Sequence, residues 1–214
     1  MKVAFLALLC AGSALAALPK LAYIRSFPGS DPAYFQVEID RDGLLEYKES
    51  PTDDHPVKTQ LTPSEVGPLF SDAEKLNCFK SPIESGLKVA NTGKKTFRYQ
   101  AADGATSETV FNYSTDETAH DLLERFENIA ASEHAYLQLD STARYDKLGV
   151  NDALANIESL WLHKQLAAPQ QFIPLLTRVA THESYMHLAR ERAARLKDQF
   201  QSVPAATAAD TKSK

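Results

Sequence analysis

The stretch from residue 34 to residue 48 alternates between apolar and polar side chains, which is typical of strands that bury one face. Within it, Asp42-Gly43 favours a tight hairpin turn, because glycine tolerates the positive φ that such turns require. The pattern therefore predicts two antiparallel strands, the second over residues 44–48, and residues 57–61 look like a short further segment. The apolar positions that set the alternation are Phe35, Val37 and Ile39.

A helix is predicted directly after this segment. Thr62 is a good N-cap residue, Pro63 fits the first turn, and Glu65 completes a capping box in which side chains and backbone amides pair. Apolar residues then follow at helical spacing and give the helix one apolar face. They are Val66, Leu69, Phe70, Ala73 and Leu76.

The same order of elements occurs a second time. Residues 95–101 and 106–113 have strand character and are joined by a second Asp-Gly turn at 103–104. Residues 114–117, Ser-Thr-Asp-Glu, form a second capping box before another amphipathic helix. The apolar stripe of that helix consists of Leu122, Leu123, Phe126, Ile129 and Ala130. We therefore predict an α+β domain over residues 17–140: a four-stranded antiparallel sheet in a ββαββα arrangement, with helices on one face.

Strand character ends after Tyr145, and three amphipathic stretches follow. Their apolar residues are, in order, Leu154, Ile157, Leu160 and Trp161; Phe172, Leu175, Leu176 and Val179; and Tyr185, Leu188, Ala189, Leu196 and Phe200. Asn151 is expected to cap the first helix, and Pro174 to lie in the first turn of the second. Short connections between such helices predict an antiparallel helical region over residues 141–200. The small and polar residues 201–214 predict a disordered tail.

Residues 1–16 have the character of a signal peptide. Lys2 supplies a positive charge, an apolar run too short to span a bilayer follows, and Ala-Leu-Ala at 14–16 fits a cleavage site. A lipid-anchored Cys10 is the alternative, which the bulky Leu9 before it disfavours. We expect a secreted or periplasmic protein without a transmembrane segment after the leader is removed.

Charge and cysteine content narrow the function classes. The formal net charge is −5, and it is one unit more negative without Lys2, which argues against nucleic acid as a partner. Once Cys10 is removed with the leader, Cys78 has no second cysteine with which to form an internal disulfide. We interpret Cys78 as a buried small hydrophobic residue, with a reactive thiol as the alternative. Stability must then come from an apolar core.

The sequence from His182 to His187 comes close to a zinc-protease motif and fails it. That motif needs histidines at positions i and i+4, so that both rings share one face of a helix. Here the spacing is i, i+5, which places the rings about 140° apart. Glu183 and His187 do share a face, but two ligands do not make a metal site.

Two acidic segments are better explained as turns than as cation sites. Asp53-Asp54-His55 could hold a hard cation, yet it lies between strand segments and beside prolines, where aspartate is a common turn residue. Residues 40–43 resemble the start of a calcium loop, but Pro51 stands where a bidentate glutamate is required. We therefore assign no catalytic, cofactor-binding or metal-binding residue, and we expect no cofactor.

Gly29, Pro32 and Tyr34, followed by Asp42-Gly43 and Tyr47, carry a resemblance to a known family. Over roughly residues 25–130 the chain resembles bacterial exported domains of uncharacterised function. These have the pattern Cys-x-Gly-x-Cys-Pro-x-Tyr, a strand, Asp-Gly and a second strand. Phe27 and Asp31 stand here in place of the two cysteines. The resemblance implies a bacterial envelope setting and an α+β fold, and it implies no particular reaction.

Three functional hypotheses follow, of which we favour the first. A non-catalytic binding or scaffolding module of the cell envelope, with a protein partner, predicts an exposed apolar or aromatic patch without convergent titratable groups. A hydrolytic or metal-dependent enzyme predicts that several candidate residues converge on one pocket. Those candidates are His55, His163, His182, Glu183 and His187. An inhibitor or chaperone-like protein would bind another secreted protein through the free edge or the outer face of the sheet.

Overall fold

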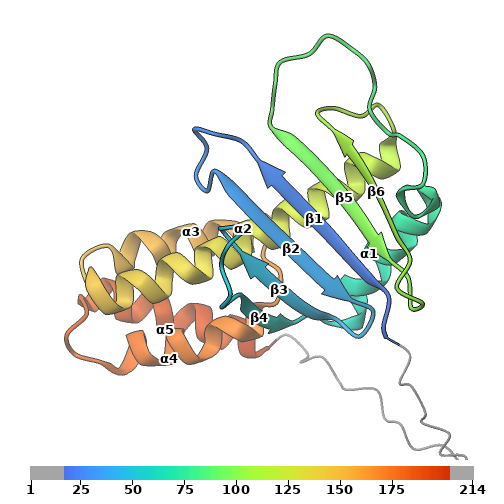
Figure 1. The fold of residues 1–214 in the computed structure, drawn as a ribbon. Helices are drawn as coiled ribbons and strands as arrows, with labels where there is room; N and C mark the ends of the chain where they lie inside the picture. The colour runs from blue at the N-terminus through green and yellow to red at the C-terminus, as the bar shows by residue number, and fades with distance from the viewer. Residues whose placement is uncertain (1–16, 203–214) are drawn as a thin grey trace, which may run out of the picture.

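A six-stranded antiparallel sheet and five α-helices make up residues 17–202, the part of the chain that the computed structural model describes (Figure 1). The predicted leader and the predicted tail from residue 203 onward lie outside the described residues. Along the chain the elements are β1 (Lys20–Ser26), β2 (Tyr34–Asp40), β3 (Leu44–Lys48), β4 (Val57–Gln60), α1 (Pro63–Lys75), the 3₁₀ helix η1 (Asn77–Phe79), β5 (Lys94–Gln100), β6 (Thr106–Phe111), α2 (Glu117–Tyr145), α3 (Val150–Leu162), the 3₁₀ helix η2 (Pro169–Phe172), α4 (Ile173–Thr181) and α5 (His187–Gln201). The predicted α+β class and antiparallel sheet are confirmed.

The prediction of four strands is wrong, because it omits β1 and does not count β4 as part of the sheet. The strand order is β4-β3-β2-β1-β5-β6, so the omitted strand β1 lies at the centre of the sheet. Its residues Leu21–Ile24 are apolar without interruption, and such a short run shows no period of two. The reason is burial on both faces: Leu21 and Tyr23 face the core, and Ala22, on the opposite face, is also buried.

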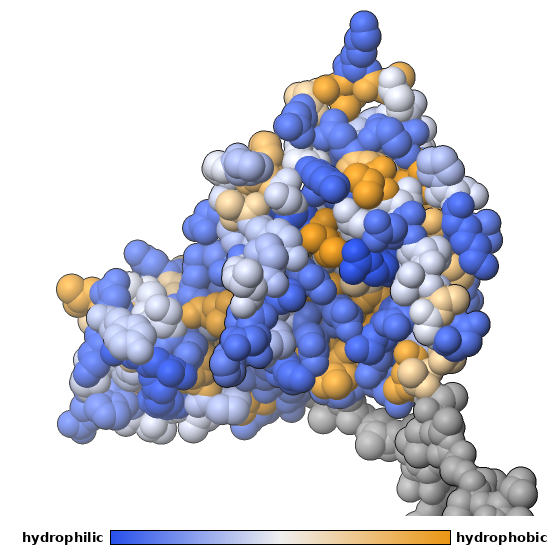
Figure 2. All heavy atoms as spheres, viewed as in Figure 1, coloured by the Kyte–Doolittle hydropathy of each residue, from blue (hydrophilic) through white to orange (hydrophobic). Residues whose placement is uncertain are grey.

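Helices α1 and α2 cover one face of this sheet, as Figure 1 shows. Their apolar faces meet the core-facing side chains of the strands in one hydrophobic cluster, in which the aromatic rings of Tyr23, Phe35, Phe97 and Phe126 pack against one another. The other face is open and is spanned by ion pairs between neighbouring strands. They join Lys20 to Glu38, Lys58 to Glu46 and Arg98 to Glu108. Figure 2, viewed from this side, shows mostly polar side chains over the sheet.

Helix α2 is one continuous helix of 29 residues that belongs to two hydrophobic clusters. Its first half, from Ala119 to Ala130, packs on the sheet, and the part from Ala135 to Ala143 packs with α3, α4 and α5. The predicted boundary between residues 140 and 141 therefore falls inside α2. No helix within residues 17–202 combines the length and apolar character needed to cross a membrane.

Several helix ends match the predictions, and others shift by a few residues. The Thr62 capping box is present in full, and Pro174 lies in the first turn of α4. Asp116, rather than Ser114, caps α2 by accepting a hydrogen bond from the Ala119 amide. Gly149, rather than Asn151, is the N-cap residue of α3. Tyr185 and Leu188 were both predicted on the apolar face of the last helix, but Tyr185 precedes α5 and Leu188 is exposed. Cys78, predicted to be buried, is half-buried and has a positive φ.

Candidate functional site

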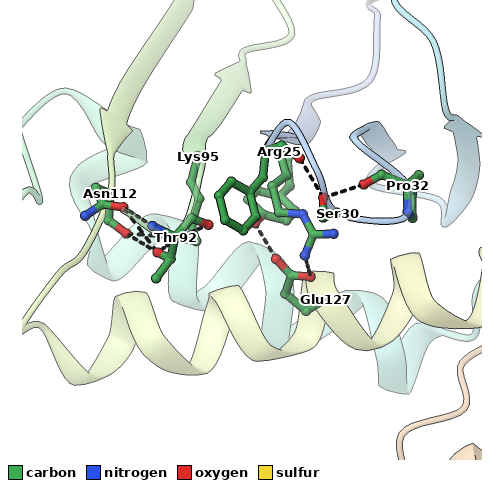
Figure 3. A network of polar contacts seen from close by, with 9 residues as sticks. Arg25, Ser30, Pro32, Thr92, Lys95, Asn112 and Glu127 are labelled. Carbon is green, nitrogen blue, oxygen red and sulfur yellow. Dashed lines mark hydrogen bonds and ion pairs between the residues drawn. The ribbon is translucent and has the colours of Figure 1, made fainter. Parts of the chain in front are cut away.

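Two surfaces of the molecule have features that folding alone does not explain. The first is a crevice at one end of the sheet, where β1 passes over α2 (Figure 3). Arg25 follows Leu21 and Tyr23 on the core-facing side of β1, so the strand carries a charged group to the edge of the apolar core. Its Nη1 lies 2.9 Å from Glu127 Oε2, and the Tyr23 hydroxyl donates to Glu127 Oε1 at 2.6 Å. Burial first, and then the charge of Glu127, raise the pKa of Tyr23, which therefore stays protonated as a donor.

The guanidinium of Arg25 is only partly satisfied. Its side chain is 21% exposed and stacks over the Phe35 ring at 4.6 Å from the ring centre. Its Nε is buried and has no hydrogen-bond partner. A buried donor without an acceptor costs roughly 1–3 kcal/mol. Because the Nε itself is closed to solvent, an added acceptor can reach Arg25 only at the exposed part of its guanidinium.

The hollow beside Arg25 has a volume of about 210 Å³ and lies between the β1–β2 turn, the sheet, α2 and α3. We define the crevice as this hollow. Its polar side chains include Arg25, Asp31, Glu127 and His134, and its apolar wall is formed by Pro32, Phe35, Ala130, Ala131 and Leu160. The Ser30 hydroxyl lies 2.8 Å from the carbonyl oxygens of both Phe27 and Pro32, either of which can accept its one hydrogen, and so it shapes the turn at the rim (Figure 3).

A second polar group lies at the α3 side of the crevice. His134 Nδ1 lies 2.6 Å from Glu49 Oε1, and the Tyr47 hydroxyl donates to the same oxygen at 2.9 Å. The hydrogen bond to Glu49 raises the pKa of His134, although burial opposes it. Burial by itself would raise the pKa of Glu49, but the hydrogen bonds from His134 and Tyr47 outweigh it and leave this pKa lowered.

Lys95, the neighbour of Arg25 on β5, has a structural role. Its ammonium donates to Thr92 Oγ1 at 2.7 Å, to the Asn112 carbonyl at 2.9 Å and to the Thr92 carbonyl at 3.4 Å (Figure 3). An ammonium has three hydrogens, so these bonds occupy all of them. Desolvation lowers the pKa of Lys95, and Lys95 closes the loop before β5 rather than offering a free charge.

The second surface lies at the end of the helical region where the α2–α3 and α4–α5 connections meet. The Tyr185 hydroxyl donates to the Ala143 carbonyl at 2.8 Å, and Lys147 Nζ lies 5.8 Å from the Tyr185 ring centre. Figure 1 shows both connections at the same end. We name four exposed residues here the apolar tip: Tyr145 (84% exposed), Leu148 (75%), Leu188 (50%) and Met186 (44%).

The Asp53-Asp54-His55 segment forms an exposed turn between β3 and β4. The His55 amide donates to Asp53 Oδ1 at 2.9 Å, and its Nδ1 lies 2.7 Å from Asp54 Oδ1. Among residues 17–202 these three form the one group of metal-ligating side chains close enough together to share an ion. Their hydrogen bonds are those of an aspartate turn, as predicted, and nothing covers them.

The other candidate residues of the enzyme hypothesis have local contacts. His163 Nδ1 lies 2.8 Å from the Ser159 carbonyl, and His187 Nε2 lies 3.2 Å from Glu191. His182 Nδ1 lies 2.8 Å from the Ser184 hydroxyl. Within the described chain none of these histidines, nor Glu183, joins His55 in a group that could share a metal ion.

Sequence patterns did not point to three charged or polar residues of the crevice. Arg25 lies in the omitted strand, and no motif includes Glu127 or His134. One signal was available: Glu127, Ala131 and His134 recur at i, i+4 and i+7, which places two charged groups and a small residue on one helix face.

No family model matches the chain, and no curated protein matches it significantly.

Proposed function

We propose that this protein is an exported, non-catalytic binding module that docks a protein partner of the cell envelope through the apolar tip. The observation that carries the proposal is the exposure of four large apolar side chains in or directly beside the α2–α3 and α4–α5 connections. Single exposed apolar residues are ordinary, whereas a cluster of them is typical of an interaction surface. Leu148, Met186 and Leu188 have no titratable group, as the binding hypothesis expects.

The two alternatives have less support. The enzyme hypothesis needs its histidines and Glu183 to converge, and the contacts of His163, His182 and His187 are local. Binding through the outer face of the sheet meets a surface whose charges already pair with each other across neighbouring strands. A partner would have to replace these pairs, with little gain from surface ion pairs in water.

Site-specific photo-crosslinking tests the proposal. A benzophenone amino acid at Leu148 should give a protein adduct of defined mass in intact cells of the source organism. The same group at Leu87, which is 57% exposed in the loop before β5, should not. The combined substitution Met186→Ser and Leu188→Ser should abolish the adduct without changing the circular dichroism spectrum, because both side chains are exposed.

The same preparation tests the export part. Intact-mass measurement of the mature protein should place its N-terminus at Ala17, after the predicted cleavage site. An uncleaved cytoplasmic chain would overturn export, and equal adducts from positions 148 and 87 would overturn docking at the tip. Sedimentation with phosphatidylglycerol vesicles, in the absence of any protein adduct, would show a lipid surface in place of a protein partner.

A further inference from the structure

We propose that the crevice binds a small zwitterion, namely a free α-amino acid with an apolar side chain. This site is separate from the apolar tip and does not depend on the function proposed above. It lies where the sheet meets α2 and α3, and junctions between packed units are common places for small-molecule sites.

Arg25 supplies the contact for the carboxylate. Its Nη1 is held by Glu127, and its Nε is buried beyond the reach of a ligand. The other terminal nitrogen, Nη2, is the group of this guanidinium that can donate to a carboxylate oxygen. The ion pair with Glu127 and the stacking on Phe35 hold the guanidinium in place before a ligand arrives. Figure 3 shows the Arg25 side chain reaching toward α2, with the Ser30–Pro32 turn beside it.

Asp31 supplies the contact for the ammonium group. Asp31 is exposed, its carboxylate lines the crevice from the β1–β2 turn, and its negative charge helps to raise the pKa of His134. The two cationic side chains that line the crevice are already paired, Arg25 with Glu127 and His134 with Glu49. A purely anionic ligand would therefore meet the charges of Asp31 and Glu127, and a purely cationic one would meet Arg25. A ligand that has both charges can pair its carboxylate with Arg25 and its ammonium group with Asp31.

The remaining wall fits an apolar side chain of modest size. Pro32, Phe35, Ala130, Ala131 and Leu160 line the hollow. Its volume of about 210 Å³ is below the range of roughly 300–1,000 Å³ that holds drug-sized ligands. Two adjacent alanines on α2 keep this space open, because larger side chains at these positions would fill it.

Titration calorimetry with the purified full chain tests the inference. The probes are L-leucine, L-phenylalanine, N-acetyl-L-leucine, which lacks the ammonium, and L-leucinamide, which lacks the carboxylate. We expect at least one of the two amino acids to bind, and each leucine derivative to bind at least tenfold more weakly than L-leucine. Amide shifts in ¹H–¹⁵N spectra should locate the bound ligand at Phe35 and Ala131.

Variants separate the two contacts. Arg25→Lys keeps the charge near Glu127 but loses the second terminal nitrogen that would donate to the ligand, so it should weaken amino-acid binding at least tenfold. Asp31→Asn should weaken the binding of L-leucine and strengthen the binding of N-acetyl-L-leucine, because it removes a negative charge that an anionic ligand meets. Ala131→Trp should fill the crevice and abolish binding, whereas Ser141→Trp, at an exposed position of the same helix, should not.

The outcomes distinguish this inference from the proposed function. Absence of binding by both amino acids, or equal binding of L-leucine and its two derivatives, would overturn the zwitterion site and leave docking at the tip untouched. Binding that survives Ala131→Trp would place the ligand elsewhere and would also overturn it. Loss of the cross-link at position 148 with retained amino-acid binding would overturn only the docking proposal.

Discussion

His134 has a hydrogen-bond partner on each nitrogen of its ring. Nδ1 faces Glu49 at 2.6 Å, and Nε2 lies 2.7 Å from Gln138 Nε2, one helical turn further along α2. The Gln138 amide can donate to Nε2 only while the ring is neutral. Because Glu49 stabilises the protonated ring, the pKa of His134 is raised, and the same contact helps to lower the pKa of Glu49. A strand end and a helix separated by 85 residues are thereby joined at a single oxygen.

The pair should have a limited pH window. The raised pKa of His134 means that its contribution to stability is complete below the ordinary histidine value of about 6.5 and is lost as pH rises through the pKa of the folded state. The lowered pKa of Glu49 means that its contribution is present above the ordinary glutamate value and is lost as pH falls. NMR titration of the His134 ring should give a midpoint above about 6.5, and Glu49→Gln should lower that midpoint. Glu46→Gln on the open face is the control, and an unchanged midpoint in Glu49→Gln would contradict the assignment.

At the scale of elements, the two Asp-Gly turns behave as the sequence predicts. Gly43 and Gly104 have φ of +91° and +85°, and each lies in the turn of a hairpin. Their surroundings differ. A Cβ at Gly43 would lie 2.7 Å from the Leu61 carbonyl oxygen, whereas nothing lies within 4 Å of a Cβ at Gly104. The first turn is packed against the start of α1, and the second projects into solvent.

Substitution of the glycine by alanine should therefore lower the free energy of unfolding by different amounts in the two turns. Gly104→Ala carries only the strain of positive φ, which is about 1–2 kcal/mol. Gly43→Ala adds a clash with backbone atoms and should lose about 3 kcal/mol, at the upper end of ordinary single substitutions. Urea unfolding measures both, and equal losses in the two variants would show that the close packing at Gly43 relaxes freely.

The elements that the sequence missed or shifted have a common cause. Capping boxes and period-two strands are local patterns, and they predicted β2, β3, β5, β6 and the starts of α1 and α4 well. Strand β1 has no local signature because it is apolar on both sides. At α2 two residues of the same capping pattern compete, and the Ser114 hydroxyl accepts from the Asp116 amide while Asp116 takes the cap.

At the scale of the whole molecule, α2 joins the sheet to the helical region, and a buried carboxylate lies along it. Glu133 is fully buried; its Oε1 accepts a hydrogen bond from Gln171 Nε2 at 2.8 Å, and its Oε2 has no partner. Burial raises the pKa of Glu133 to about 7, and the bond from Gln171 opposes this only in part. The junction of the two hydrophobic clusters thus contains a group that holds a proton up to nearly neutral pH.

This carboxyl should make the molecule less stable as pH rises. Its contribution is greatest below about pH 4.5, where both states are protonated, and is lost as pH rises through about 7, because the unfolded chain releases the proton first. Between pH 5 and pH 8 the free energy of unfolding should fall by about 2–3 kcal/mol because of this group. Glu133→Gln should remove this component, so its unfolding free energy relative to wild type should rise by that amount over the same interval. Glu124→Gln, exposed on the same helix, should track wild type; a Glu133→Gln variant that also tracks wild type would contradict the assignment.

Local sequence patterns encode the hairpins, most helix starts and the amphipathic faces, because these follow from backbone geometry and from contact with water within a few residues. The central place of β1 in the sheet and the membership of α2 in two cores emerge from tertiary packing alone. The same packing brings Arg25 to Glu127 across 102 residues and Glu49 to His134 across 85. Such pairs depend on which strands and helices become neighbours, and no periodicity along the chain encodes that choice.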